Sequence, residues 1–208
     1  MAHGRPAANI SVKSRIRLEN LRVLVLDEFL RLGRRPTRTE LAQRLQITIS
    51  ELDRSLKRLE RNDILVLGKD GEIKAAYPYS ALQTTHRVEV EGKVLFANCA
   101  VDALSIPFMI RRNAVIRSQC GSCGAPIRIM FEDSKISFSD PSGVQVWYVP
   151  PQPRVVSVDS QCPAINFFCR KHFEKWRSQH PGLTGKLLTL KEAAEHGRRT
   201  YGNALRIK

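Results

Sequence analysis

The sequence lacks any apolar run long enough to cross a bilayer. A membrane-spanning helix needs about 20 predominantly apolar residues, whereas the longest mostly apolar stretch, 96–110, contains Asn98, Asp102, Ser105 and Pro107. The first residues also carry no apolar segment behind their charges, so no secretory signal is expected. We therefore expect a cytoplasmic protein with no membrane partner.

Acidic residues are scarce relative to basic ones. The 208 residues include 34 Lys and Arg but only 20 Asp and Glu, which gives a net charge of +14. The excess is spread evenly, because residues 1–80 hold 16 basic and 10 acidic side chains and residues 81–208 hold 18 and 10. A dedicated nucleic-acid-binding protein usually concentrates its positive charge on one element. The distribution favours solubility and weak attraction for anions over specific nucleic-acid binding.

Cysteine is infrequent, and its count is odd. An odd number of cysteines in a chain without a secretory signal is not typical of a disulfide framework. Buried structural thiols, a metal site and thiolate chemistry remain open. The five residues concerned are Cys99, Cys120, Cys123, Cys162 and Cys169.

The fold class expected is α+β, in two domains. Residues 1–80 show apolar residues at helical spacing up to Gly33, then two capping boxes, Thr37-x-x-Glu40 and Thr48-x-x-Glu51, that open further helices. A β-hairpin follows over 64–77, around a turn at Asp70-Gly71. Three helices and a two-stranded wing predict a winged-helix-like N-terminal domain.

Residues 81–208 predict a mixed, mostly antiparallel β-sheet domain with flanking helices. The pattern predicts a helix over 97–108 that ends at Pro107, and strands near 88–95, 115–118, 126–131, 136–138 and 144–149. Residues 160–168 are expected to form another strand, which would carry Cys162. A helix over 170–179, a strand over 186–190 and a final helix over 191–201 complete the domain.

Cys99 and Asp102 form the first candidate site. On a helix, residues three apart project from the same face, and a thiol in the first turn has its pKa lowered by the helix dipole. A neighbouring carboxylate raises that pKa, unless it takes the proton itself. Such a pair could exchange one proton, although a small buried cysteine beside a capping aspartate explains the same pattern. Cys162, taken alone, fits a buried apolar position on a strand.

A zinc site is the second candidate. Cys120-x-x-Cys123 with Cys169-x-x-His172 could supply four zinc ligands. Against this interpretation, 45 residues separate Cys123 from Cys169.

From about Val88 to its end, the chain resembles the organomercurial (alkylmercury) lyase family. The shared marks include Cys99-Ala-Val-Asp102-Ala-Leu before Pro107, and Cys162 five residues before Phe167-Phe168. Two further motifs agree, namely Ser118-Gln-Cys120-Gly-Ser-Cys-Gly124-Ala-Pro126 and Trp176-x-x-x-His180-x-Gly182-Leu183-x-Gly185. The winged-helix-like N-terminal domain expected over residues 1–80 also fits that family. In two places the sequence departs from it, since Asn98 replaces a frequent aromatic residue and Pro163 replaces a second cysteine found in some relatives.

The resemblance implies a function and a set of site residues. Cys99 and Cys162 match the two mercury-binding thiols and Asp102 matches the proton-handling carboxylate, so these three would also hold the Hg(II) product. Cys120 matches a cysteine that is structural in the family, whereas Cys123, Cys169 and His172 receive no role. The implied reaction is protonolysis of a carbon–mercury bond, with no organic cofactor or permanent metal. Implied partners are an organomercurial substrate, cytosolic thiols that remove Hg(II), and a mercuric reductase. We expect the two sulfur atoms to meet around Asp102 in a sheltered pocket.

Two other functions remain open. A winged-helix DNA-binding regulator that senses a thiophilic metal would explain the N-terminal module and the charge, but Glu51, Asp53 and Glu60 interrupt the basic residues of its third helix. A zinc-stabilised binding module would use the Cys120 and Cys169 motifs.

Overall fold

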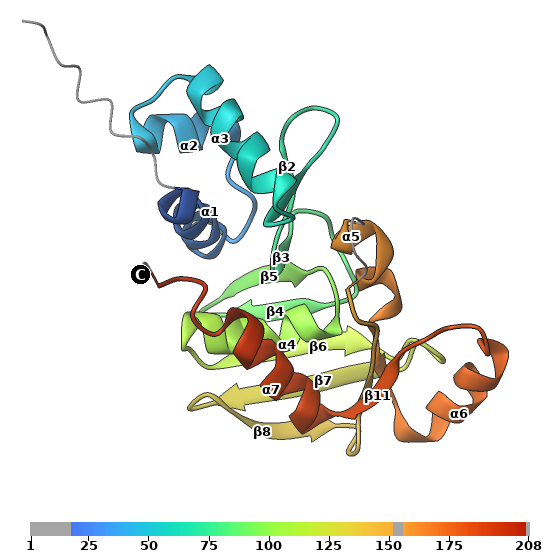
Figure 1. Ribbon diagram of the computed structural model, residues 1–208. Coiled ribbons are helices and arrows are strands. Elements are labelled where there is room, and N and C mark those ends of the chain that lie inside the picture. The colour runs from blue at the N-terminus through green and yellow to red at the C-terminus, as the bar shows by residue number, and fades with distance from the viewer. Residues whose placement is uncertain (1–17, 152–155, 207–208) are drawn as a thin grey trace, which may run out of the picture.

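The protein has a mixed α+β fold, seen here in a computed structural model that describes residues 18–151 and 156–206 (Figure 1). Its helices are α1 (Leu18–Leu32), α2 (Arg38–Leu45), α3 (Ile49–Arg61), α4 (Ala100–Ile110), α5 (Ser157–Ser160), α6 (Arg170–Gln179) and α7 (Leu190–Tyr201), with a 3-10 turn, η1, at Cys162–Ala164. Its strands are β1 (Leu65–Leu67), β2 (Ile73–Ala76), β3 (Tyr79–Ser80), β4 (Arg87–Val90), β5 (Lys93–Ala97), β6 (Ala114–Gln119), β7 (Pro126–Glu132), β8 (Lys135–Asp140), β9 (Gln145–Tyr148), β10 (Phe167–Phe168) and β11 (Lys186–Thr189). None of the described helices is both long enough and apolar enough to cross a membrane.

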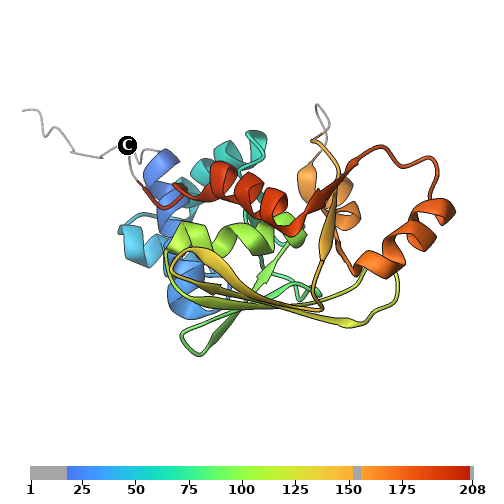
Figure 2. The ribbon, with the colours of Figure 1, turned by 90° about the horizontal axis from the view of Figure 1, so that it is seen from below.

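Two antiparallel sheets organise the described part of the chain. The larger has eight strands in the order β1-β2-β3-β5-β4-β6-β7-β8, and the smaller has the order β10-β9-β11. Every strand pairing is antiparallel, as the sequence predicted. Helix α4 lies on one face of the large sheet and α7 covers α4 from outside (Figure 2).

The close contact between α4 and α7 depends on a glycine. A Cβ atom added to Gly197 of α7 would come within 3.1 Å of the Val101 carbonyl oxygen and of the Ser105 Cβ atom, both on α4. With α7 on one side and the sheet on the other, nearly every residue of α4 is buried. The helix that carries Asp102 is therefore enclosed on both sides.

The prediction that Pro107 ends this helix is wrong. Helix α4 continues through Pro107 to Ile110 and stops at Arg111, which adopts a left-handed conformation with φ of 55°. A proline inside a helix removes one backbone hydrogen bond and crowds the carbonyl four residues earlier, but packing can offset that cost. Here the surrounding residues, including Ile106, Met109 and Ile110, are buried apolar side chains.

The prediction of a strand over residues 160–168 is also wrong. The segment contains the end of α5, the η1 turn and only two strand residues, Phe167 and Phe168. Pro163 lies at the start of η1, where its missing N–H group costs nothing and its fixed φ suits a helical turn. Cys162 therefore occupies a tight turn rather than a strand.

The N-terminal helices form as their capping boxes predicted. The Thr37 and Thr48 side chains accept hydrogen bonds from the backbone N–H groups of Glu40 and Glu51, and both glutamates return the bond. The β1–β2 hairpin follows as expected, and β2 pairs with β3, so the large sheet includes strands on both sides of residue 80. A domain boundary at residue 80 stays a prediction.

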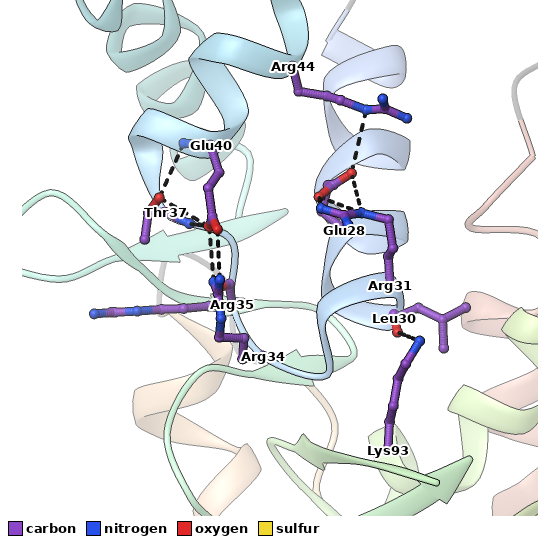
Figure 3. Close-up of polar contacts among 9 residues, drawn as sticks. All are labelled: Glu28, Leu30, Arg31, Arg34, Arg35, Thr37, Glu40, Arg44 and Lys93. Carbon is purple, nitrogen blue, oxygen red and sulfur yellow. Dashed lines mark hydrogen bonds and ion pairs between the residues drawn. The ribbon is translucent and has the colours of Figure 1, made fainter. Parts of the chain in front are cut away.

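Polar contacts, drawn in Figure 3, and an aromatic contact join the N-terminal helices to each other and to the sheet. Buried Glu28 of α1 pairs with Arg31 at 2.6 Å and with Arg44 of α2 at 3.6 Å. The Lys93 ammonium of β5 donates a hydrogen bond of 3.3 Å to the carbonyl oxygen of Leu30. The Phe29 ring stacks on Tyr79, with 5.3 Å between ring centroids. These contacts join α1 to α2 and hold α1 against β3 and β5, two interior strands of the large sheet.

Candidate active site

Cys99 lies at the N-cap of α4, directly after β5 brings the chain to the buried end of that helix. Its backbone is extended, with φ of −153°, and its Sγ accepts a hydrogen bond of 3.4 Å from the Asp102 backbone N–H. The thiol therefore takes the place that a serine or threonine oxygen usually fills at a helix start. The same geometry holds Cys99 and Asp102 on one side of the first turn.

Cys162 reaches this pair from a distant part of the chain. Its Sγ lies 4.0 Å from Asp102 Oδ2, and the Cys99 sulfur, the Cys162 sulfur and a carboxylate oxygen of Asp102 all lie within 4.8 Å of one another. The Ala100 N–H donates a hydrogen bond of 3.1 Å to the Ile165 carbonyl oxygen, which ties the η1 segment to the start of α4. The three side chains are only 3–4% exposed. The two sulfur atoms thus meet around Asp102, as the sequence led us to expect.

Burial is the largest influence on the pKa values of Cys99 and Asp102. It raises the pKa of Asp102 from 3.8 to about 7, although hydrogen bonding to Cys99 and Asn98 opposes the shift. It also raises the pKa of the Cys99 thiol well above 9, together with hydrogen bonding to Cys162 and the charge of Asp102. The backbone N–H at the helix start lowers the Cys99 pKa, but this contribution is smaller than the rise caused by loss of hydration. Asp102 can therefore gain and lose a proton near neutral pH.

Replacement of Asp102 by asparagine should change the pH dependence of stability. Because the pKa of Asp102 is raised in the folded state, protonated Asp102 stabilises the fold. This stabilisation is complete below about pH 4 and is lost as the pH rises through about 7. A rise from 3.8 to about 7 corresponds to about 4 kcal/mol at most. The free energy of unfolding of Asp102→Asn, minus that of wild type, should therefore be larger at pH 8 than at pH 5. Urea denaturation of both proteins at the two pH values measures this difference.

His86 provides an opposite pH effect that is common to both proteins in this experiment. Burial lowers the pKa of His86 to about 4, so the stability linked to this group is lost as the pH falls below 6.5. This contribution cancels in the difference between variant and wild type. An identical stability difference at pH 5 and pH 8 would show that Asp102 is ionised throughout and that the raised pKa is wrong.

Three tyrosines are affected by the charges of the cluster, and the sequence did not point to them. Burial raises the pKa of Tyr201 of α7, and the charges of Asp102, Cys99 and Cys162 raise it further. Burial likewise raises the pKa values of Tyr77 and Tyr148, which also respond to the charge of Cys162 and of Cys99, respectively. The three phenols therefore lie close enough to the cluster for its charges to affect their pKa values. No local pattern in the sequence connects the three, because they come from separate elements.

The N-terminal module holds the segment that leads to Cys162. Asp63 accepts a hydrogen bond of 2.7 Å from the Ser157 hydroxyl and one of 3.2 Å from the Tyr77 hydroxyl. The Tyr77 oxygen in turn accepts a bond of 2.9 Å from the Val158 N–H, and Lys74 pairs with Asp159 at 2.8 Å. Helix α5, just before Cys162, is therefore anchored to residues of the first 80.

The remaining cysteines form a second cluster. Cys120, Cys123, Cys169 and His172 each offer a ligand atom, and these four atoms lie within 4.8 Å of one another. The fold therefore brings these residues together, although 45 residues separate Cys123 from Cys169 in the sequence. Burial would raise the pKa of Cys120, but N–H groups of Cys169, Ser122 and Cys123 bring it down to about 7, whereas burial and the neighbouring Cys120 raise that of Cys169 to about 12.

Comparison with known proteins assigns the chain to a family. Residues 79–202 match the family model described as "MerB: Alkylmercury lyase". The alkylmercury lyase of Bacillus cereus is 38% identical over 118 residues, which cover 56% of this chain and 53% of that protein, and the Staphylococcus epidermidis enzyme is 32% identical over 133 residues, 64% and 60% of the two chains. The chain thus spans about half the length of the curated relatives it matches.

A solved structure shows the same fold. The mercury-bound form of MerB2 superposes with a TM-score of 0.75 at 24% sequence identity, covering 91% of this chain and 98% of that one. At this identity the likeness concerns the fold alone. Because the family model covers more than half of the sequence and its span includes Cys99, Asp102 and Cys162, the chain belongs to the alkylmercury lyase family.

Proposed function

We propose that the protein is an organomercurial lyase that cleaves the carbon–mercury bond of alkyl- or arylmercury compounds by protonolysis. The products would be a hydrocarbon and Hg(II). The observation that carries the proposal is the buried grouping of two thiols and one carboxyl group with a pKa near 7. The curated relatives bear the name alkylmercury lyase, and the MerB2 structure contains mercury, which supports the same assignment.

Two thiols suit an organomercury cation, R–Hg⁺, because this soft acid prefers sulfur to oxygen or nitrogen. One cysteine would first exchange with the small thiolate that carries the substrate, forming an R–Hg–S bond and releasing the small thiol with the cysteine proton. That single bond leaves the carbon–mercury bond inert, since expelling a carbanion into water is prohibitive. A second thiolate adds electron density to mercury and weakens its bond to carbon.

Asp102 would carry the proton between the second thiol and the carbon. Its carboxylate takes the proton of the remaining cysteine as that sulfur binds mercury, and the resulting carboxylic acid then protonates the carbon as the carbon–mercury bond breaks. The steps give R–H, Hg(II) held by the sulfurs of Cys99 and Cys162, and Asp102 as carboxylate again. A pKa of about 7 suits both directions of transfer near neutral pH. The chemistry requires no organic cofactor.

Release of Hg(II) completes the proposed cycle. Two small cytosolic thiols would displace the cysteines, restoring both thiols and giving a mercury dithiolate for a mercuric reductase. The proposed role is mercury detoxification in the cytoplasm.

The N-terminal module is proposed to be a winged-helix-like packing element rather than a DNA reader. The proposed division puts this domain at 1–80 and the catalytic domain at 81–208. Within the described residues, the module supports the segment before Cys162 through Asp63, Lys74 and Tyr77. The acidic residues of α3 have structural partners, since Asp53 pairs with Arg38 at 3.2 Å and Glu60 accepts a bond of 2.9 Å from the Leu67 N–H. A metal-sensing DNA-binding regulator is therefore not favoured.

The direct test is release of hydrocarbon. The full chain is incubated with phenylmercury or methylmercury and an excess of a small thiol, and benzene or methane is measured. Repeated turnover is expected, with hydrocarbon exceeding the amount of enzyme. Tight retention of intact organomercury with no hydrocarbon above the chemical background would instead identify a passive binding protein.

A further inference from the structure

The cluster of Cys120, Cys123, Cys169 and His172 has no part in the proposed reaction, yet it has the composition of a metal site. Three thiols and one imidazole from two separate segments bring their ligand atoms within 4.8 Å of one another. Cys120 and Cys169 are buried, His172 is half-buried and Cys123 is exposed. Three sulfurs and one nitrogen are a donor set typical of structural zinc.

The first two ligands lie on a tight turn between β6 and β7. The Gly124 N–H donates a hydrogen bond of 2.9 Å to the Cys120 carbonyl oxygen, and the Cys120 N–H bonds to the Ala125 carbonyl oxygen at the same distance. Gly124 adopts φ of +69°, a conformation that glycine takes without strain. This turn folds Cys123 back toward Cys120, as a Cys-x-x-Cys pair must do to bind one ion.

The other two ligands lie at the start of α6. Cys169 is the N-cap residue and His172 follows in the first turn, where its N–H bonds to the Cys169 carbonyl oxygen at 2.9 Å. The spacing of three residues places both side chains on the same face of the helix. The Nδ1 atom of His172 is buried and has no hydrogen-bond partner among the described residues. A buried imidazole nitrogen without a partner is costly unless a ligand satisfies it.

Backbone contacts join the two halves. The Cys169 N–H donates a hydrogen bond of 3.3 Å to Cys120 Sγ, and the Gly121 N–H donates one of 2.8 Å to the Phe167 carbonyl oxygen. N–H donors aimed at sulfur stabilise a thiolate ligand, as the outer contacts of metal sites do. The site is thus held together by the backbone before any ion binds.

We propose that Cys120, Cys123, Cys169 and His172 bind one structural zinc ion. Tetrahedral zinc with Zn–S bonds of about 2.3 Å would hold its sulfur ligands roughly 3.8 Å apart, so only small side-chain movements are required from the present spacing. The three cysteines bind as thiolates, so any protons still on their sulfurs are released, and the complex carries one net negative charge. Four protein ligands fill the coordination sphere, so the ion supports the fold and takes no part in bond cleavage.

The zinc ion would stabilise the part of the fold that presents Cys162. Cys169 follows directly after β10, whose residues Phe167 and Phe168 lead back along the chain to the η1 turn. A zinc ion that links the β6–β7 turn to the start of α6 would therefore fix the chain on the C-terminal side of Cys162. Helix α5 anchors the chain on its N-terminal side. The proposal stands independently of the lyase reaction.

Zinc content provides the test, measured before any exposure to mercury. The full chain and its variants are kept reduced, incubated with zinc chloride, freed of loose metal by gel filtration and analysed by mass spectrometry of the metal. Wild type should retain about one zinc per chain, and Cys123→Ser and His172→Ala should lose it by about tenfold or more. The matched control Cys99→Ser, in the mercury-site cluster, should retain zinc like wild type.

A second measurement identifies the ligands directly. Cobalt(II) in place of zinc should give the visible bands of a tetrahedral ion and thiolate-to-cobalt charge transfer, both weakened in Cys123→Ser. Because Cys123 is exposed, its replacement by serine opens no cavity, and circular dichroism checks that the variant is folded. Zinc-free wild type after incubation, or equal zinc in Cys123→Ser and wild type, would overturn the proposal. Loss of zinc from Cys99→Ser alone would place the ion at the mercury site and overturn it too.

Discussion

Replacement of Asp102 by alanine should abolish most hydrocarbon release while organomercury still binds. The two thiols remain in Asp102→Ala, so the soft mercury cation keeps its sulfur ligands. The proton that must reach carbon has lost its carrier, and positioned proton transfer is typically worth about 10²–10⁴-fold in rate. Benzene release from phenylmercury should fall by about that factor, whereas the total mercury that the protein retains after gel filtration should match wild type.

Glu195→Ala provides the control for this experiment. Glu195 is an exposed acid on α7 that pairs with Arg198 at 2.7 Å, and it lies outside the buried cluster. Its replacement removes one carboxylate from the protein without affecting the proton carrier, so turnover should stay near the wild-type rate. Turnover of Asp102→Ala within about threefold of wild type would contradict the proton-transfer role, since even a modest general acid contributes more.

The parts of the fold set by local interactions were predicted well. The capping boxes at Thr37 and Thr48 and the helix over 170–179 appear where the sequence placed them, because each depends on residues within one or two turns. The predicted end of the helix at Pro107 was wrong, because it depends on contacts far away in the sequence. A proline marks where hydrogen bonds are lost, but burial of α4 decides whether the helix continues, and that burial depends on α7 and the sheet.

The two cysteine clusters required the tertiary fold. Cys99 and Asp102 are three residues apart, so their proximity follows from helical geometry, whereas Cys162 joins them only through the order of strands and the Ala100–Ile165 hydrogen bond. The family resemblance named Cys162 without supplying that geometry. For Cys120 and Cys169, sequence separation suggested independence, yet β6 and β10 end side by side, joined by the Gly121–Phe167 bond. The tyrosines whose pKa values respond to the cluster gave no sequence signal, because they share only their nearness in space.

Single replacements of Cys99 or Cys162 by alanine should each lower turnover by orders of magnitude. In the proposed reaction one sulfur only anchors R–Hg⁺, and cleavage starts when the second sulfur binds, so either loss leaves mercury with one thiolate and an intact bond to carbon. Both side chains are nearly fully buried beside Asp102, so no described exposed thiol can take their place without rearrangement. Rates of benzene release from phenylmercury with excess small thiol provide the measurement.

The double variant gives the sharper result, because the two thiols should act as a unit. Effects of residues that work together are strongly non-additive, so the Cys99→Ala, Cys162→Ala protein should release hydrocarbon no more slowly than either single variant. It should differ in binding, since each single variant keeps one sulfur able to hold phenylmercury and the double variant keeps none in this cluster. Any phenylmercury bound by the cluster of Cys120, Cys123, Cys169 and His172 should be equal in the three variants, so it does not affect the comparison. Independent, multiplying losses of rate, or a single variant with wild-type turnover, would mean that the sulfurs do not act on the same mercury atom.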